Sequence, residues 1–371
     1  MKVLFTTNIP SPYRIQFFNE LSKYCELTVV YERKNAKDRD IEWLNREKIN
    51  FDVKFLKGIK VGNEMAFCPE IIKIIKKGHF DLIVVGGYST PTGMVLINYL
   101  KRKKVKFILN SDGGIIKEDN IFKYKIKKYF ISSASAWLST GKETTKYLKH
   151  YGAKEEEIYV YPFTSINEKD ILNEPITIEQ KNKVKTELGI SEEKVIISIG
   201  QFIHRKGFDI LLKAIKNVSS QVGVYIIGGQ PTDEYIELKE NLQFLNVHFV
   251  GFKSKDELKK YYKIADVFVL PTREDIWGLV INEALAFGLP VITTDKCVAG
   301  LELIANGKNG YIIPVDDVEA LSNKINNLAN VSKEEREKYY INNIKKTKEY
   351  TIENMAQKHI EIFERLKEKL Q

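Results

Sequence analysis

The sequence predicts an α/β protein made of two doubly wound, Rossmann-like domains. Short β-branched runs alternate with amphipathic helical patterns along the chain, which is typical of parallel sheets covered by helices. One polar segment, residues 167–193, interrupts this alternation and separates two similar series. A length of 371 residues with 43% apolar content suits two globular domains. We expect the domains at residues 1–165 and 166–350 to face each other across a cleft, the usual place for a ligand, with 351–371 forming a helix that packs back toward the first domain.

The first series contains predicted strands at residues 2–5, 27–31, 51–55, 82–85, 107–109 and 136–139. Helices are predicted between them at 13–24, 69–77, 91–102, 120–131 and 142–151. The second series contains predicted strands at 195–199, 224–227, 247–250, 267–270, 291–293 and 311–313. Its helices are predicted at 208–217, 232–241, 255–264, 279–287 and 318–328. In such sheets, ligands bind beyond the carboxyl ends of the strands.

The positive charge lies in the first half of the chain. Residues 1–165 hold 29 Lys and Arg against 18 Asp and Glu, a net charge of +11, whereas the whole chain has +9. Residues 101–106 and 120–131 carry much of the excess. In the second stretch, apolar residues recur at helical spacing and lysines stand between them, which predicts a basic amphipathic helix. The apolar residues are Ile121, Phe122, Ile126, Tyr129 and Phe130, and the lysines are Lys123, Lys125, Lys127 and Lys128.

This basic helix has three interpretations. It can be a packed helix with a solvated lysine face, since runs of charged residues usually lie on the protein surface. It can contact an anionic membrane surface, where each basic group adds about 1 kcal/mol. Nucleic acid is disfavoured, because no helix-turn-helix, zinc finger or RNP-like motif accompanies the charge.

Several other classes of protein are disfavoured. The first apolar run is too short for a signal peptide, and no run approaches the ~20 residues that span a bilayer, so we expect a cytoplasmic protein, at most peripheral on the inner face of the plasma membrane. Three scattered cysteines and five histidines have no metal-ligand spacing. Asp38 and Asp40 form an Asp-x-Asp string in a lysine-rich polar stretch, so we attribute it to chance and expect no metal.

Two turns in the second half carry candidate chemistry. Residues 200–207, Gly-Gln-Phe-Ile-His-Arg-Lys-Gly, follow a buried strand and open a helix, so Gly200, Arg205 and Lys206 suit a diphosphate. The second turn follows the strand at 267–270 and contains Asp275, with Glu283 on the next helix among apolar neighbours. A carboxylate in apolar company needs a defined partner. A rise of about 12 Å along a helix favours two separate hydroxyl-binding roles over a glycosidase pair.

The two turns together resemble the donor-binding domain of GT-B glycosyltransferases of family 4, the glycosyl transferases group 1. The signature of that family is Glu-x7-Glu followed by Ala and a Gly-Leu-Pro-Val-Ile strand, and residues 275–292 match it with Asp275 in place of the first Glu. The resemblance covers most of residues 195–315 and extends more weakly to 139–148 and 158–162. It departs from the family at Asp275, at Gln201, where Arg is frequent, and in an N-terminal loop without a glycine-rich turn.

The resemblance implies roles for individual residues. Glu283 would accept hydrogen bonds from the ribose and Asp275 would contact the donor sugar, while Arg205 and Lys206 would offset the charge of the leaving diphosphate. The full donor-binding set is Gly200, Arg205, Lys206, Phe252 beside the base, Asp275, Ile276, Trp277, Gly278, Leu279 and Glu283. Arg205, Lys206, Asp275 and Asp112 are the predicted catalytic residues.

Loops at strand ends of the first domain would face the acceptor. They contain Pro12, Tyr13, Arg14, Tyr88 and Asp112. Asp112 is the ionisable group suited to orienting or deprotonating an acceptor hydroxyl. A turn aspartate before two glycines also has a purely structural explanation.

The sequence thus leads to one main functional hypothesis and two alternatives. The main one is a retaining, metal-independent glycosyltransferase without cofactor that moves a sugar from a UDP- or GDP-linked donor to a glycan or lipid-linked glycan of bacterial surface polysaccharide synthesis. The alternatives are a sugar-nucleotide epimerase of the same fold, which would convert the donor alone, and a non-catalytic membrane-docking protein.

Overall fold

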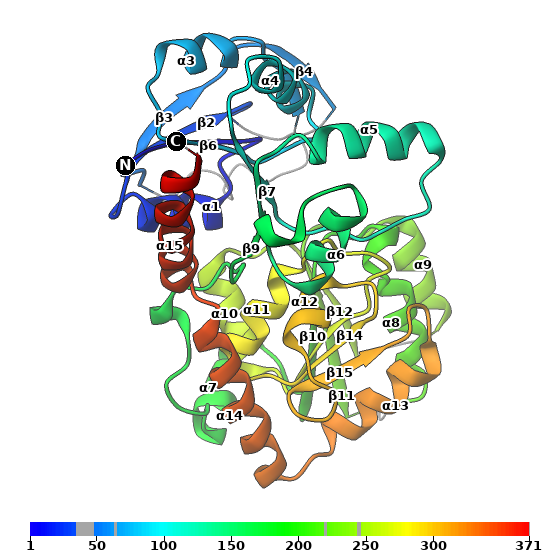
Figure 1. Ribbon diagram of the computed structural model, residues 1–371. Helices are drawn as coiled ribbons and strands as arrows, with labels where there is room; N and C mark the ends of the chain where they lie inside the picture. Colours follow the sequence, from blue (N-terminus) through cyan, green and yellow to red (C-terminus); the bar gives the residue numbers. More distant parts are fainter. Residues whose placement is uncertain (35–47, 63–64, 219–220, 243–245, 371) are drawn as a thin grey trace. The chain divides into compact units, whose positions relative to one another are not determined.

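The computed structural model describes residues 1–34, 48–62, 65–218, 221–242 and 246–370 (Figure 1). It divides into two compact units. Unit 1 comprises residues 1–165 and 350–371, and unit 2 comprises residues 166–349. The Asp-x-Asp string at Asp38 and Asp40 lies outside the described residues.

Unit 1 is built on a seven-stranded parallel sheet in the order β3-β2-β1-β6-β7-β8-β9. The strands are β1 (Lys2–Thr7), β2 (Glu26–Tyr31), β3 (Asp52–Phe55), β6 (Leu82–Val85), β7 (Ile108–Ser111), β8 (Ala136–Ser139) and β9 (Ile158–Val160). The helices are α1 (Pro12–Leu21), α3 (Ile71–Lys77), α4 (Pro91–Arg102), α5 (Ile121–Ile131), α6 (Lys142–His150) and α15 (Ile352–Leu370). The central strands are buried along nearly their whole length because helices cover both faces of a parallel sheet.

The C-terminal helix α15 packs against α1 (Figure 1). His359 lies in this contact, with its ring centroid 4.7 Å from that of Phe17 and 4.4 Å from that of Tyr161. It is 1% exposed, and burial lowers its pKa to about 4, so the imidazole is neutral in the folded state.

Unit 2 repeats the scheme with six parallel strands in the order β12-β11-β10-β13-β14-β15. They are β10 (Lys194–Ile199), β11 (Val222–Ile227), β12 (Val247–Val250), β13 (Val267–Leu270), β14 (Val291–Thr294) and β15 (Gly310–Ile313). The helices are α7 (Ile178–Leu188), α8 (Phe208–Ile215), α9 (Asp233–Asn241), α10 (Lys255–Ile264), α11 (Leu279–Ala286), α12 (Val298–Leu303), α13 (Val318–Ala329) and α14 (Lys333–Glu349).

Each sheet has a switch point, where the strand order reverses and loops on its two sides leave a crevice for a ligand. In unit 1 the reversal lies between β1 and β6. In unit 2 it lies between β10 and β13. The two candidate turns of unit 2, which follow β10 and β13, therefore flank its switch point.

Some elements were not predicted from the sequence. The segment expected to be a polar connector contains α7, which begins with a capping box between Thr177 and Gln180 and ends at Gly189 in the left-handed conformation. The helices α12 and α14 and an antiparallel hairpin of β4 (Ile59–Val61) and β5 (Met65–Phe67) were also missed.

The predicted basic helix forms as α5, but only part of its predicted apolar face is covered: Phe130 is buried and Ile126 packs against the core. Ile121 and Phe122 are each 75% exposed and Tyr129 is 42% exposed, whereas Phe130 and Ile131 are buried. The outward face of α5 therefore mixes apolar side chains with Lys125 and Lys128 rather than presenting lysines alone. Among the described residues, no helix is both long enough and apolar enough to cross a membrane.

Candidate functional site

In unit 2, the turn after β10 and the turn after β13 lie against each other. The first runs through a short 3-10 helix, His204–Lys206, to Gly207, whose φ of 68° is in the left-handed region that favours glycine. A Cβ at Gly207 would lie 2.0 Å from the carbonyl oxygen of Pro271, in the second turn. Only glycine allows this close approach.

Hydrogen bonds to backbone carbonyl oxygens join the two turns. The amide of Arg273 donates to the carbonyl oxygen of Arg205 at 2.8 Å, and the hydroxyl of Thr272 donates to the same oxygen at 2.8 Å. In the opposite direction, the Arg205 guanidinium donates to the carbonyl oxygen of Glu274 at 2.7 Å. The turns thus form one unit of structure, although about 70 residues separate them in the sequence.

The joined turns bring Lys206 and Asp275 together. The Lys206 Nζ lies 2.6 Å from Asp275 Oδ2, and the side chains are 13% and 12% exposed. Arg205 Nη1 lies 3.8 Å from the same carboxylate oxygen. Two cations and one carboxylate are therefore concentrated at the switch point, a local excess of positive charge that suits an anionic ligand.

The turn that carries Asp275 is fixed on its other side by the start of α12. The Asp275 amide donates to the carbonyl oxygen of Lys296, and its own carbonyl accepts from the Val298 amide at 3.1 Å. The Cys297 Sγ donates to the Trp277 carbonyl oxygen at 3.1 Å. Burial, with the nearby Asp275 charge, raises the pKa of Cys297 to about 12, so it remains a thiol. This backing makes the turn rigid.

Glu283 has a defined partner on a neighbouring helix. The hydroxyl of Tyr262, on α10, donates to Glu283 Oε2 at 2.9 Å. Tyr262 is 2% exposed, and burial, reinforced by the Glu283 charge, raises its pKa well above the usual value, so it stays a hydrogen-bond donor. The structure thus orients the carboxylate that the sequence pattern singled out.

The remaining predicted donor residues occupy four different environments. Trp277 is 2% exposed and its indole nitrogen donates to Asn282 Oδ1 at 2.9 Å, so its ring is a packing element. Ile276 is 53% exposed in front of Gly278, whose φ is 100°, and the helix α11 begins at Leu279. Phe252 is 40% exposed beyond β12, which β11 separates from β10. Gly200 lies at the end of β10 against the Lys206 side chain.

In unit 1, Asp112 accepts hydrogen bonds from three donors at the end of β7. Its carboxylate is paired with the guanidinium of Arg14, from α1. Asn110 Nδ2 donates to Asp112 Oδ1 at 2.8 Å, and the hydroxyl of Tyr161 donates to the same oxygen at 3.3 Å. These contacts hold the Asp112 carboxylate in one orientation at the end of β7.

The other predicted acceptor residues lie on the same edge of the unit 1 sheet. Pro12 opens α1, and the ring of Tyr13 lies 5.8 Å from that of Phe163, centroid to centroid. Tyr88, after β6, shares a hydroxyl contact with Tyr147 of α6. These residues follow β1 and β6, the strands on the two sides of the switch point.

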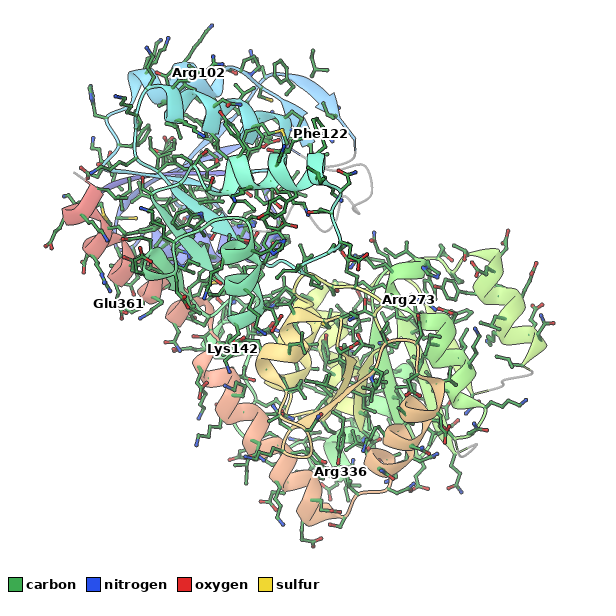
Figure 2. All side chains as sticks on the ribbon, turned by 45° about the vertical axis from the view of Figure 1, so that its right-hand side comes forward. Arg102, Phe122, Lys142, Arg273, Arg336 and Glu361 are labelled. Carbon is green, nitrogen blue, oxygen red and sulfur yellow. The ribbon has the colours of Figure 1, made fainter. Side chains whose placement is uncertain are left out.

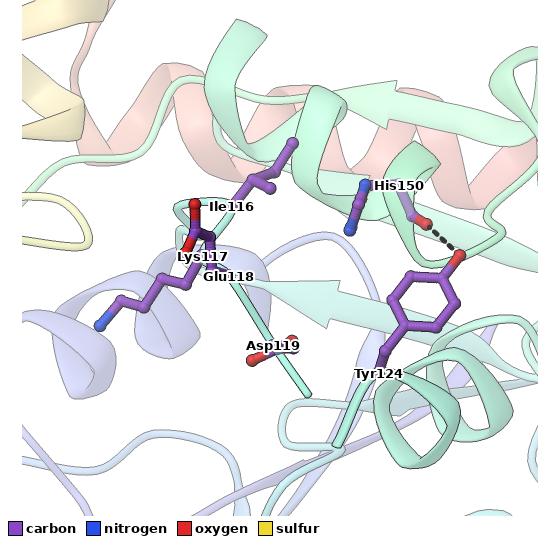
Figure 3. A pocket seen from close by; sticks show the side chains of 6 residues that line it. All are labelled: Ile116, Lys117, Glu118, Asp119, Tyr124 and His150. Atoms are coloured by element: carbon purple, nitrogen blue, oxygen red, sulfur yellow. Dashed lines mark hydrogen bonds between the residues drawn. The ribbon is translucent and has the colours of Figure 1, made fainter. Parts of the chain in front are cut away.

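A pocket of about 450 Å³ lies in unit 1 beyond Asp112, on the loop that leads to α5 (Figure 3). Its lining comprises Ile116, Lys117, Glu118, Asp119, Tyr124 and His150. The Tyr124 hydroxyl donates to the His150 carbonyl oxygen across the pocket. The Asp119 carboxylate is held by Lys123 and Lys127 and accepts from Tyr151, which keeps its pKa near 2.

In the described part of the chain, no three His, Cys, Asp or Glu side chains gather in a way that could hold a metal ion. The sequence analysis missed Tyr262, Tyr147 and Tyr161, which contact predicted residues through their hydroxyls. No local sequence pattern could have identified these tyrosines, because each contacts a residue that lies 21 to 59 positions away in the sequence.

Comparison with known proteins identifies a domain in the second half of the chain. Residues 180–347 match the family model described as glycosyl transferases group 1. The chain is 22% identical over 311 residues to the N,N'-diacetylbacillosaminyl-diphospho-undecaprenol alpha-1,3-N-acetylgalactosaminyltransferase of Campylobacter jejuni, covering 80% of each protein. It is 32% identical over 187 residues to the capsular polysaccharide biosynthesis glycosyltransferase CapM of Staphylococcus aureus, covering 48% of this chain and 47% of that relative.

Solved structures resemble the whole chain. The HepE protein of Anabaena, solved in complex with UDP and glucose, superposes with a TM-score of 0.79 at 16% identity, covering 98% of this chain and 100% of HepE. The predicted GT-B fold class is thereby confirmed. The group 1 domain and the relatives named as glycosyltransferases also confirm that the chain is a transferase enzyme.

Proposed function

We propose that this chain is a retaining glycosyltransferase of family 4 that acts at the cytoplasmic face of a bacterial membrane. It transfers a sugar from a UDP- or GDP-linked donor to a lipid-linked glycan intermediate of surface polysaccharide synthesis. The observation that carries the proposal is the pairing of Lys206 with Asp275 at the switch point of unit 2. There a cationic turn, a carboxylate and the start of α11 converge, which is the arrangement that a sugar linked to a diphosphate requires.

In the proposed donor complex, unit 2 holds the nucleotide and positions the sugar. Lys206 and Arg205 neutralise the diphosphate together with the first amides of α11, which point out of the helix start. Glu283, oriented by Tyr262, accepts hydrogen bonds from the ribose hydroxyls. Asp275 accepts from hydroxyls of the transferred sugar.

The reaction then needs no metal and no protein nucleophile. As the bond between the anomeric carbon and the diphosphate oxygen breaks, its electron pair passes to that oxygen, whose charge the Lys206 ammonium stabilises. The acceptor hydroxyl attacks from the same face and gives its proton to a donor phosphate oxygen, so the anomeric configuration is retained. Asp112, fixed by Arg14, orients that hydroxyl.

Two features support a lipid-linked acceptor. The Campylobacter jejuni relative is named for a diphospho-undecaprenol substrate. Independently, α5 exposes Ile121 and Phe122 beside Lys125 and Lys128, the combination that binds interfaces rich in anionic lipid. Phe122 is labelled on this helix in Figure 2. The face contains apolar groups able to enter the lipid as well as cations that meet its headgroups.

The transfer reaction can be tested with purified full-length chain, UDP- and GDP-linked sugars, and a short-chain polyprenyl-diphosphate-linked sugar as acceptor. We expect nucleotide release that depends on the acceptor, with a product whose anomeric configuration, read by NMR, equals that of the donor. Lys206→Ala and Glu283→Gln should abolish transfer, whereas Lys216→Ala and Glu240→Gln, in the same unit, should not. An inverted product would overturn retention, and conversion of donor alone would identify an epimerase.

The membrane contact can be tested separately by flotation with phosphatidylglycerol and phosphatidylcholine vesicles. The double variant Ile121→Ser and Phe122→Ser should lose most binding to phosphatidylglycerol vesicles. Ile178→Ser is the control, because Ile178 is also 75% exposed but lies in unit 2. Equal flotation of the double variant and the wild type would refute the assignment of this face.

A further inference from the structure

Arg273 is a partly buried cation in the second of the two joined turns of unit 2, and its side chain faces the first. Its side chain is 17% exposed. Its Nη1 and Nη2 donate to the two carboxylate oxygens of Asp209 at 2.8 and 2.7 Å. Nη1 also donates to the His204 carbonyl oxygen at 2.8 Å, and Nε lies 2.8 Å from Asp316 Oδ1. Three sides of the guanidinium are therefore occupied by protein groups.

The partners of Arg273 come from separate parts of unit 2. His204 belongs to the turn after β10, residues 200–207, which we call the cationic turn. Asp209 lies at the start of α8, immediately after that turn. Asp316 lies beyond β15 and adopts a φ of 62°, a left-handed conformation that non-glycine residues rarely accept. The backbone amide of Arg273 also donates to the Arg205 carbonyl oxygen. One residue thus connects the cationic turn, α8, the acidic turn (residues 271–278, after β13) and the segment after β15.

These contacts distinguish Arg273 from the cations around it. Arg205 is 44% exposed at the switch point, where a ligand can reach it, whereas the Arg273 guanidinium is enclosed by carboxylates and a carbonyl oxygen. The Asp209 hydrogen bond, partly opposed by burial, raises the pKa of Arg273, so its charge is permanent. A cation that is already neutralised contributes little to binding a second anion directly. Any effect of Arg273 on ligand binding must therefore act through the groups that it contacts.

The Lys206 ammonium and the Asp275 carboxylate depend on this connection. Lys206 lies in the cationic turn and Asp275 in the acidic turn, so their 2.6 Å contact requires the two turns to keep a fixed separation. Arg273 holds that spacing from the side of α8, and the Arg205–Glu274 hydrogen bond holds it from the other side. A misplacement of about 1 Å at such a site can lower the reaction rate about a hundredfold.

We propose that Arg273, held by Asp209 and Asp316, is a positioning residue that fixes the cationic turn against the acidic turn and thereby sets the affinity for the donor diphosphate. This inference rests on the proposed function, which places the diphosphate at Lys206. Arg273 itself does not touch the donor. A substitution of Arg273 keeps both Lys206 and Asp275 but allows the two turns to move apart.

The test compares Arg273→Gln and Arg273→Lys with Arg336→Gln. Arg336 is the matched control, because it also pairs with an aspartate, Asp266, but at the other end of β13 (Figure 2). The dissociation constants of UDP, GDP, uridine and guanosine are measured by calorimetry, together with the melting temperature, and kcat and KM where transfer is detected.

For Arg273→Gln, we expect the affinity for the nucleoside diphosphate to fall about tenfold to a hundredfold, the effect of losing one hydrogen bond between the diphosphate and a charged group. The nucleoside should bind as before, and the donor KM should rise more than kcat falls. Arg273→Lys should recover part of the affinity through a single contact with Asp209. Arg336→Gln should lower the melting temperature without changing the affinity.

Two results would overturn the inference. One is wild-type affinity for the nucleoside diphosphate in folded Arg273→Gln protein. The other is an equal loss of affinity in Arg336→Gln, which would mean that stability alone controls binding. If the wild type bound neither UDP nor GDP, the proposed function would fail instead.

Backbone hydrogen exchange tests, without a ligand, whether Arg273 positions the two turns. Residues 200–209 and 271–279 should exchange faster in Arg273→Gln than in Arg336→Gln. Equal exchange in the two variants would contradict the role of Arg273.

Discussion

Asp266, which precedes β13, is a buried charge on which the stability of unit 2 depends. It is 4% exposed, its Oδ1 pairs with Lys181 at 2.7 Å and with Arg336, and its Oδ2 accepts from the Val195 amide at 2.9 Å. Burial alone would raise the pKa of Asp266, but the two cations hold it below its usual value. The carboxylate is therefore charged at neutral pH and connects α7, α14 and β10.

The substitution Asp266→Asn keeps the shape and removes the charge. Breaking a buried ion pair from one side costs about 3–5 kcal/mol, because Lys181 and Arg336 lose their counter-charge while their side chains stay 17% and 36% exposed. For a domain the size of unit 2, each kcal/mol lowers the melting temperature by about 2–4 °C, so the expected fall is roughly 6–20 °C.

Differential scanning calorimetry measures this fall, with Asp256→Asn as the control. The Asp256 side chain is 90% exposed and pairs with Lys259 at 3.5 Å, so its charge is screened by solvent and its loss should leave the melting temperature nearly unchanged. Equal melting temperatures for the two variants would refute the role assigned to the buried charge.

Three further predictions concern the two units. Tyr262→Phe removes the hydroxyl that orients Glu283, so we expect the donor KM to rise about tenfold with kcat nearly preserved, and an unchanged KM would contradict this. Gly207→Ala should weaken nucleoside diphosphate binding, whereas Gly189→Ala, at almost the same φ but with open space around it, should not; calorimetry compares them. His359 has a pKa of about 4 when folded and 6.5 ordinarily, so the unfolded state binds more protons between these values. The stability of unit 1 should therefore fall by roughly 3 kcal/mol as the pH drops from 6.5 to 4, and urea unfolding of His359→Leu should show this slope reduced.

The alternation of strands and helices was sufficient to predict the fold class, because a buried parallel strand requires a continuous apolar run. Residues 267–270 and 82–85 are such runs, and all their side chains are buried. The helix α7 was missed because it is polar on nearly all sides. It is stabilised by its capping box and by contacts such as Lys181 with Asp266, 85 residues away, which no local pattern can show.

The candidate site was predicted only where a residue type is unusual for its neighbourhood. Glu283 stood out as a carboxylate among apolar residues, and the structure gives it the Tyr262 hydroxyl. Arg273 resembled an ordinary loop arginine, because its partner Asp209 lies 64 residues earlier. Ile121 and Phe122 were grouped with Ile126 and Phe130 on one apolar face by their spacing, but the spacing does not say which side of a short helix the sheet will cover.

The central claim is that unit 2 binds a nucleotide-linked sugar with Lys206 on the diphosphate and Glu283 on the ribose. Calorimetric dissociation constants for UDP, GDP, uridine and guanosine test it most directly. Lys206→Ala should weaken only the diphosphates, by at least about tenfold, because hydrogen bonds to charged groups are worth about 1.5–3 kcal/mol. Glu283→Gln should weaken the diphosphate and its nucleoside alike. Equal losses for nucleoside and diphosphate in Lys206→Ala, or no loss in either variant, would contradict the account.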